Sequence, residues 1–190
     1  MSNIRAWLFR GLVVMAIGLL VTSWLLPWWQ ATIFEIPGNW VKIHPWGLAL
    51  NLGGYEVHVS EAKMPVWFAP LMWAYLGICI GAVSYSLWLA EKEVKIVRLK
   101  LKRSQLLIGG VGLSYIFIVI LAVIVAMIRT EEFFDLKFIG STFIQITQAE
   151  ESWVDTKLLP GYWLACGVGP LLIILALLRN KIIGRPKLSA

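Results

Sequence analysis

Two histidines, His44 and His58, are the residues best suited to hold a metal ion, and both lie in one segment between apolar stretches. Imidazole and carboxylate groups bind zinc, so Glu35, Glu56 or Glu61 could complete such a site. The spacing of these residues matches no common pattern of zinc ligands. We therefore expect both histidines to be solvent-exposed or hydrogen-bonded, and we expect no bound metal.

The two cysteines, Cys79 and Cys166, each lie inside an apolar stretch, and the sequence contains no Cys-x-x-Cys motif. A thiol–disulfide enzyme needs accessible paired cysteines, so this class is excluded. We expect both cysteines to act as small hydrophobic residues. The apolar stretches contain no histidine to bind haem or chlorophyll. Since the polar loops lack cysteine, and hence disulfides, the sequence favours a prokaryotic source.

Acidic residues gather around the segment 129–160, where they could attract a cation or a basic partner; they are Glu131, Glu132, Asp135, Glu150, Glu151 and Asp155. A solvated loop surface is the simpler interpretation. The sequence offers no Ser-His-Asp set, Gly-rich phosphate loop or pair of catalytic carboxylates, so we expect neither an enzyme nor a bound cofactor. Ion and proton pathways are usually marked by charged residues inside apolar stretches, and here there are none.

Four apolar stretches would position these groups, at 11–29, 66–90, 106–128 and 161–178. A helix needs about 20 apolar residues to cross the hydrocarbon core. We therefore predict an integral-membrane, all-α four-helix transmembrane bundle, with residues 1–190 forming a single membrane domain. The first stretch could instead be a cleaved signal peptide, because Arg5 and Arg10 precede its apolar core. Its length and the lack of a small-residue cleavage site favour a retained span.

Lys and Arg residues are concentrated in the N-terminal segment, the loop 91–105 and the C-terminal tail. Because such residues mark cytoplasmic segments, both termini are predicted in the cytoplasm and the loops 30–65 and 129–160 outside the plasma membrane. The net charge of +6 then reflects topology, and no nucleic-acid binding is expected. Five tryptophans would anchor the chain at the outer interface of the membrane. They are Trp24, Trp28, Trp29, Trp67 and Trp163.

The cytoplasmic loop 91–105 alternates basic and apolar residues, which leaves two interpretations open. It could be an amphipathic stretch on the anionic inner leaflet, or it could continue the second and third helices. Its basic residues are Lys92, Lys95, Arg98, Lys100, Lys102 and Arg103.

The two outer loops have the composition of strands. Alternating runs at 48–52 and 55–59 flank Gly53 and Gly54, which predicts a hairpin with a type I′ turn. Segments 31–36 and 40–44 are weaker strand candidates, and segment 141–148 has strand composition. Together these strands would form a small extracytoplasmic antiparallel β-sheet built from the two outer loops. Trp40 and Trp46, together with the two hairpin glycines, are candidates for contacts made by the first loop.

The order of a span, strands, two spans, a strand and a span resembles the claudin and peripheral-myelin-protein type of tetraspan. Trp40, followed by Trp46-Gly47-Leu48, is similar to the first-loop signature of that family, which is Trp, then Gly-Leu-Trp, then paired cysteines. Here the order is Trp-Gly-Leu, and neither outer loop contains a cysteine. The resemblance implies a self-associating contact protein of the cell surface.

Small residues repeat at helical spacing inside two of the stretches. Gly77 and Gly81 form a G-x-x-x-G motif, and Gly161, Ala165 and Gly169 follow one another at intervals of four. In lipid, small residues let helix backbones approach closely. We expect these faces to pack within the bundle or against a partner helix.

The sequence thus favours a non-catalytic accessory or structural subunit of a larger integral-membrane complex, such as a respiratory or other oxidoreductase. The subunit would stabilise that complex through helix packing and its outer sheet. Two alternatives stay open. One is the claudin-like contact protein, and the other is a helper of a membrane enzyme that binds a lipid or quinone beside Gly77, Gly81 or Gly169.

Overall fold

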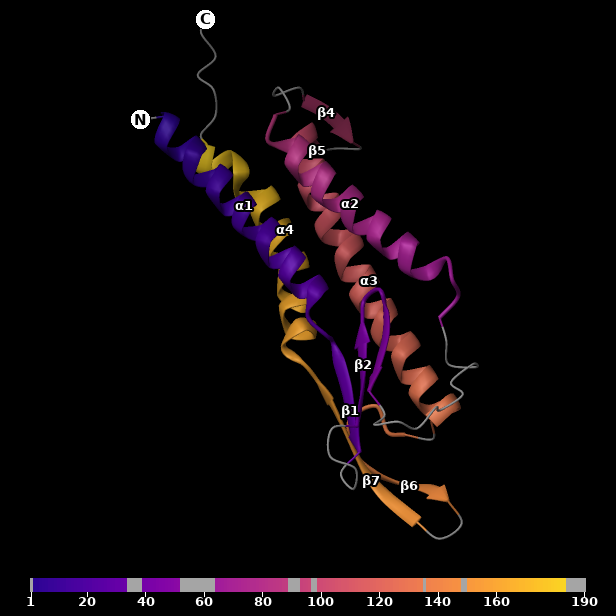
Figure 1. Ribbon diagram of the computed structural model, residues 1–190. Coiled ribbons are helices and arrows are strands. Elements are labelled where there is room, and N and C mark those ends of the chain that lie inside the picture. The colour runs from indigo at the N-terminus through magenta and orange to yellow at the C-terminus, as the bar shows by residue number, and fades with distance from the viewer. Residues whose placement is uncertain are drawn as a thin grey trace, which may run out of the picture. The chain divides into compact units, whose positions relative to one another are not determined.

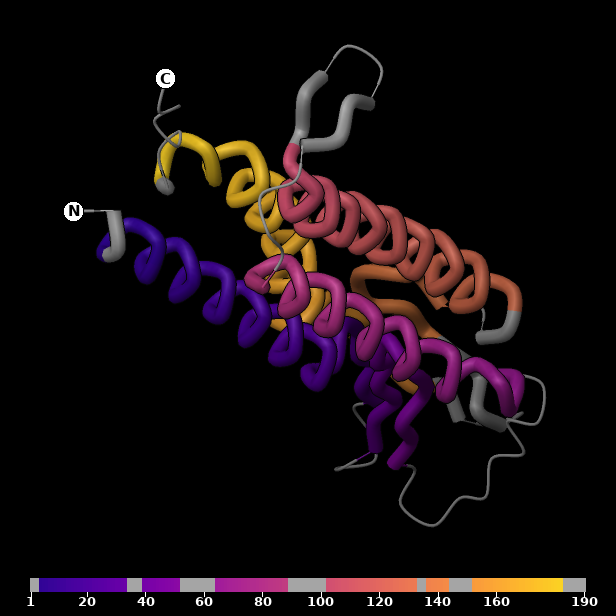
Figure 2. Tube along the Cα trace, turned by 90° about the horizontal axis from the view of Figure 1, so that it is seen from above, coloured from indigo at the N-terminus to yellow at the C-terminus, as the bar shows by residue number. Residues whose placement is uncertain are grey.

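In the computed structural model (Figure 1), the described residues are 2–33, 39–51, 64–88, 93–96, 99–134, 136–147 and 150–183. They form four helices: α1 (Ser2–Leu25), α2 (Phe68–Ser86), α3 (Arg103–Phe134) and α4 (Pro160–Ile183). Figure 2 shows each helix as a continuous coil. All four are long and apolar enough to cross a membrane, which confirms the prediction of four long apolar helices.

Prolines explain where α1 ends and α2 begins. The prediction extended the first helix to residue 29, but α1 ends at Leu25. Pro27 follows, and the residue before a proline avoids the helical conformation. Trp29 instead begins a strand. Pro70 lies in the first turn of α2, where its missing N–H costs no hydrogen bond within the helix.

Five strands form one antiparallel sheet: β1 (Trp29–Ile33), β2 (Trp40–His44), β3 (Gly47–Asn51), β6 (Gly140–Thr147) and β7 (Glu150–Leu158). Their order is β3-β2-β1-β7-β6. The central strand β1 pairs with β2 on one side and β7 on the other, so that Trp29 lies opposite both Ile43 and Leu158. The prediction of one small antiparallel sheet built from two separate segments is therefore confirmed.

One described strand of the sheet, β7, was not predicted, and the predicted hairpin is only partly described. The described hairpin partner of β3 is β2, and the turn between them is formed by Pro45 and Trp46. The predicted turn at Gly53 and Gly54 lies outside the described residues. Strand β7 was not predicted, although Ser152, Val154 and Thr156 are buried at every second position.

The segment between α2 and α3 contains a second, two-stranded antiparallel sheet, β4 (Glu93–Ile96) and β5 (Leu99–Lys102). The interpretation that this segment continues the two helices is therefore wrong. Its residues alternate between apolar and charged along the sequence, and a period of two suits a strand better than a helix.

The chain divides into two compact units. The helical unit comprises Met1–Val21, Tyr75–Phe117 and Cys166–Ala190, and the sheet unit comprises Thr22–Ala74 and Ile118–Ala165. The core of the sheet unit is a cluster of buried apolar side chains from β1, β7 and the segment after α3: Trp29, Ala31, Leu136, Phe138 and Val154. Val123 and Ala126 of α3 pack against this cluster.

Within the helical unit, α3 and α4 approach each other at two glycines. A Cβ atom added to Gly112 would lie 2.8 Å from the carbonyl oxygen of Gly169. Further along the same contact, the Gln105 side-chain amide donates a hydrogen bond of 2.9 Å to the carbonyl of Ala176. Close backbone packing and a buried hydrogen bond thus hold α3 against α4, the two devices expected between helices in lipid.

Candidate functional site

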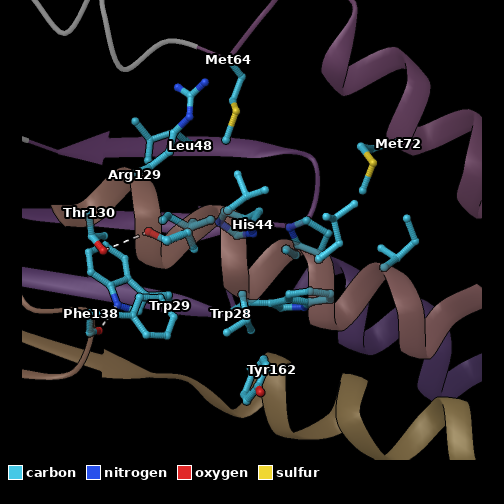
Figure 3. A pocket seen from close by; sticks show the side chains of 18 of the residues that line it. Trp28, Trp29, His44, Leu48, Met64, Met72, Arg129, Thr130, Phe138 and Tyr162 are labelled. Atoms are coloured by element: carbon cyan, nitrogen blue, oxygen red, sulfur yellow. Dashed lines mark hydrogen bonds between the residues drawn. The ribbon is translucent and has the colours of Figure 1, made fainter. Parts of the chain in front are cut away.

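The sheet unit contains an apolar cavity of about 160 Å³ (Figure 3). Its lining comes from the strands β1 to β3 and the end of β7, from the start of α2 and the residue Met64 before it, from α3 beginning at Ile118 and Phe138 after it, and from the first turn of α4. Figure 3 shows Arg129 and Met64 on one side of the cavity, and Trp28, Trp29 and Tyr162 on the opposite side. The cavity is therefore a space between the sheet and segments of α2, α3 and α4.

Two adjacent tryptophans form the aromatic wall, and hydrogen bonds fix both indole rings. The Nε1–H of Trp28 donates to the carbonyl of Ser23 at 2.7 Å. The Nε1–H of Trp29 donates to the carbonyl of Phe138 at 2.6 Å, and the rings of Trp29 and Phe138 stack with an interplanar angle of 7°. Both indoles are almost fully buried. They are core residues, so the prediction that Trp28 and Trp29 serve as membrane anchors is wrong.

Tryptophans Trp67 and Trp163 behave differently, because each is 63% exposed. An anchor at a membrane interface needs an exposed ring. Their exposure is therefore compatible with the anchoring role, which stays a prediction. Trp24 is fully buried and contacts the ring of Trp28 edge-on, so the anchoring prediction is also wrong for Trp24.

His44 is the ionisable group on the sheet side of the cavity. Burial lowers the pKa of His44 more than its hydrogen bond with the backbone of Leu25 raises it, and the charge of Lys42 lowers this pKa further. The imidazole stacks on Trp46, with ring centroids 4.8 Å apart, and Trp46 stacks in turn on Trp73 of α2. A neutral imidazole therefore borders the cavity at neutral pH.

The lowered pKa of His44 predicts that acid weakens the fold. Below about pH 6.5, the usual pKa of histidine, the unfolded chain binds a proton more readily than the folded chain does. The free energy of unfolding should therefore fall as the pH drops from about 6.5 towards the folded-state pKa. Chemical unfolding in detergent, followed at about pH 7.5 and about pH 5 on either side of the usual histidine pKa, measures this decrease.

A His44→Gln variant provides the control, because glutamine at position 44 cannot take up a proton. The other histidine, His58, is unchanged in this variant. Its decrease in unfolding free energy between the two pH values should be smaller than that of the natural chain. Equal decreases in both proteins would show that His44 is not responsible.

The structure uses the predicted small residues in two different ways. Gly161 and Gly169 meet other backbone inside the chain: a Cβ atom on Gly161 would lie 2.6 Å from the carbonyl oxygen of Pro27, and Ala165 is buried. Gly77 and Gly81 are exposed, and among the described residues nothing lies within 4 Å of an added Cβ atom at either position. Packing within the chain thus explains only one of the two sets.

The predicted contact residues of the first loop separate as well. Trp46 forms part of the stack with His44 and Trp73. Trp40 is half-buried on β2 with the Lys42 ammonium 4.2 Å from its ring centroid. Gly53 and Gly54, like His58, lie outside the described residues. The structure therefore assigns Trp46 to internal packing.

The structure describes the side chains of three of the predicted acidic residues. Glu131 and Glu132 are exposed near the end of α3, and Asp155 accepts a hydrogen bond from Ser141. Within the described parts of the chain, no three His, Cys, Asp or Glu side chains are grouped so that they could hold a metal ion. Cys79 and Cys166 are both free thiols.

Sequence reasoning missed the cavity because its lining comes from segments far apart in the chain. The adjacent pair Trp28 and Trp29 was a usable signal, because two tryptophans directly after a helix suit a core as well as an interface. Chemically, the site offers apolar walls, a neutral imidazole and one guanidinium. These groups suit non-covalent binding of an apolar molecule. A scan against models of protein families and a search of curated proteins found no match to this chain.

Proposed function

We propose that this chain is a non-catalytic subunit of a larger integral-membrane assembly, and that α2 packs against a helix of a partner subunit. Both termini would face the cytoplasm, and the five-stranded sheet would lie on the outer side of the plasma membrane, with the strands that line the cavity next to the outer leaflet. The basic residues between α2 and α3 would then meet the anionic inner leaflet.

The observation that carries this proposal is the exposed apolar surface of α2. Only 17% of its apolar stretch is buried, compared with 39% for α4. Ala74, Gly77, Ile78, Gly81 and Tyr85, which follow one another at helical spacing, are all exposed. An apolar helix that contacts only lipid needs no groove of small residues, whereas close packing between helices does.

The contacts between α3 and α4 show how this chain uses such grooves. Gly112 and Gly169 bring two backbones together at van der Waals distance. The face at Gly77 and Gly81 has the same kind of residue but no described neighbour of its own chain. A helix from another subunit would fill this groove in the way that α4 fills the groove of α3.

A double substitution on α2 tests the proposal. Gly77→Leu together with Gly81→Leu should reduce the amount of co-purified partner by about tenfold, equivalent to ~1.4 kcal/mol of association free energy. The measurement is mild-detergent extraction from native membranes, followed by a native gel and mass spectrometry of the proteins that migrate with the chain.

Gly110→Leu is the matched control, because Gly110 of α3 is also exposed and also has nothing within 4 Å of an added Cβ atom among the described residues. This variant should retain the partner. A chain that migrates alone would overturn the proposal. A ladder containing only this chain would instead support the claudin-like contact protein, and Trp40→Ala should then shorten the ladder.

A further inference from the structure

We propose that the cavity of the sheet unit binds one acyl chain of a phospholipid from the outer leaflet, with the lipid phosphate held at Arg129. The inference rests on the membrane orientation proposed above. It does not depend on whether a partner subunit exists. Gly77, Gly81 and Gly169, the positions that the sequence had suggested, are not among the residues that line this cavity.

The dimensions of the α3 wall fit one leaflet. The wall begins at Ile118 and ends at Arg129 and Thr130. Ile118 precedes Arg129 by 11 residues, which is about 16 Å along a helix. Half of the hydrocarbon core of a bilayer is about 15 Å thick. The α3 wall is therefore about as long as one leaflet of the hydrocarbon core is thick, and the segment of an acyl chain that enters the cavity would lie beside this wall.

The wall is also open to the surroundings along this length. Leu121 and Val125 line the cavity, yet they are 44% and 39% exposed. On the sheet side, by contrast, Trp28, Trp29 and Phe138 are buried. An apolar space that is closed by a core on one side and open at exposed apolar side chains on the other admits a lipid chain sideways from the bilayer.

Charge is placed at one end of the wall. Among the described residues that line the cavity, Arg129 is the one with a permanent charge, since the lowered pKa of His44 keeps its imidazole neutral. A guanidinium has five N–H donors in a planar fork, so it can bind a phosphate with two hydrogen bonds while keeping another partner. A cation directly above an apolar space complements a phosphodiester attached to an acyl chain.

The volume limits what enters. A cavity of about 150 Å³ with apolar walls holds one benzene-sized group, and this cavity measures about 160 Å³. One segment of an acyl chain fits, whereas two chains or the fused rings of a sterol do not. The second chain of the lipid would remain in the bilayer.

Native mass spectrometry of the purified full chain in detergent tests the proposal with two probes that share their acyl chains. Dioleoylphosphatidylglycerol carries the phosphate, and dioleoylglycerol lacks it. We expect one phosphatidylglycerol adduct per chain, bound about tenfold more tightly than dioleoylglycerol. Arg129→Gln should remove this preference and Arg129→Lys should restore most of it. Lys157→Gln, which neutralises an exposed cation on β7 outside the cavity, should leave it unchanged.

A second variant tests the acyl-chain site separately. Ala122 lines the cavity, so Ala122→Phe should weaken the binding of both probes by about tenfold. A photoreactive group in the middle of the acyl chain should label the peptide containing residues 118–126 in the natural chain and not in Ala122→Phe. Equal binding of the two probes, no effect of Arg129→Gln, or labelling elsewhere would each overturn the proposal.

The lipid test and the partner test fail independently. The lipid adduct is measured on the isolated chain, so its detection would stand even if no partner co-purified. Conversely, a stable complex with a partner but no preferential phosphatidylglycerol adduct would support the subunit role and eliminate the lipid site.

Discussion

Leucine in place of Gly169 should destabilise the helical unit by about 3 kcal/mol or more, because the new side chain has no space between α3 and α4. A Cβ atom at this position would lie 2.5 Å from the Cγ1 atom of Ile116 and 3.0 Å from the carbonyl oxygen of Gly112. The Ile116 side chain could rotate away, but the Gly112 backbone could not move without separating the helices. The midpoint of SDS-induced unfolding in mixed micelles, followed by circular dichroism, measures the loss.

Gly110→Leu is the matched control for this measurement too. Gly110 lies on α3, two residues before the Gly112 that Gly169 contacts, but it is exposed, and among the described residues nothing lies within 4 Å of a Cβ atom added there. Its substitution should change the unfolding free energy by no more than about 0.5 kcal/mol. If Gly169→Leu unfolded at the same SDS concentration as this control, the close approach of α3 and α4 would be refuted.

The sequence was sufficient to find the helices but not to say which of their small residues meet another helix. Long apolar runs identify spans because lipid requires every backbone hydrogen bond to be made within the helix. Gly77 and Gly81 of α2 have the same spacing as Ala165 and Gly169 of α4, yet the α4 pair is buried and the α2 pair is exposed. Small residues allow close packing without specifying a partner, so the pattern alone could not distinguish the two faces.

The strands were predictable where composition dominated. Segments 40–44 and 141–148 are rich in β-branched and aromatic residues, and they match β2 and β6. Strand β7 was missed because charged residues occupy much of its sequence, Glu150–Leu158. Its alternation is clear only when Ser152 and Thr156 are counted as buried positions. Polar residues can fill such positions when they find hydrogen-bond partners, as Thr156 does with the carbonyl of Lys137.

The cavity could not be predicted from the sequence, for a different reason. His44, Met72, Arg129 and Tyr162 line it from four separate elements or turns. No local pattern relates positions so far apart, and the pairing of β1 with both β2 and β7 is one of the contacts that bring their segments into one unit. Periodicity predicts which face of a helix or strand is apolar. A cavity forms where the side chains on several such faces leave space between them, and periodicity does not predict this.

Alanine in place of Trp29 should cost the sheet unit about 4 kcal/mol, near the upper end of the range for large-to-small substitutions in a core. The indole is 3% exposed and packs in the cluster with Leu136, Phe138 and Val154. Its removal would also leave the Phe138 carbonyl without the Nε1–H donor now 2.6 Å away, and an unsatisfied buried acceptor adds to the loss. SDS-induced unfolding monitored by circular dichroism measures the change.

Two further variants separate size from hydrogen bonding. Trp29→Phe keeps an aromatic ring in the core but lacks the donor, so it should lose roughly half as much stability as Trp29→Ala. Trp153→Ala removes the same side chain from β7, where Trp153 is 45% exposed, and should cost less than about 1 kcal/mol. Equal losses for Trp29→Ala and Trp153→Ala would mean that Trp29 is not the centre of this core. We therefore expect the loss of unfolding free energy to be largest for Trp29→Ala, smaller for Trp29→Phe and smallest for Trp153→Ala. Of the two tryptophans compared, Trp29 is the one that combines burial with a hydrogen bond from its Nε1–H.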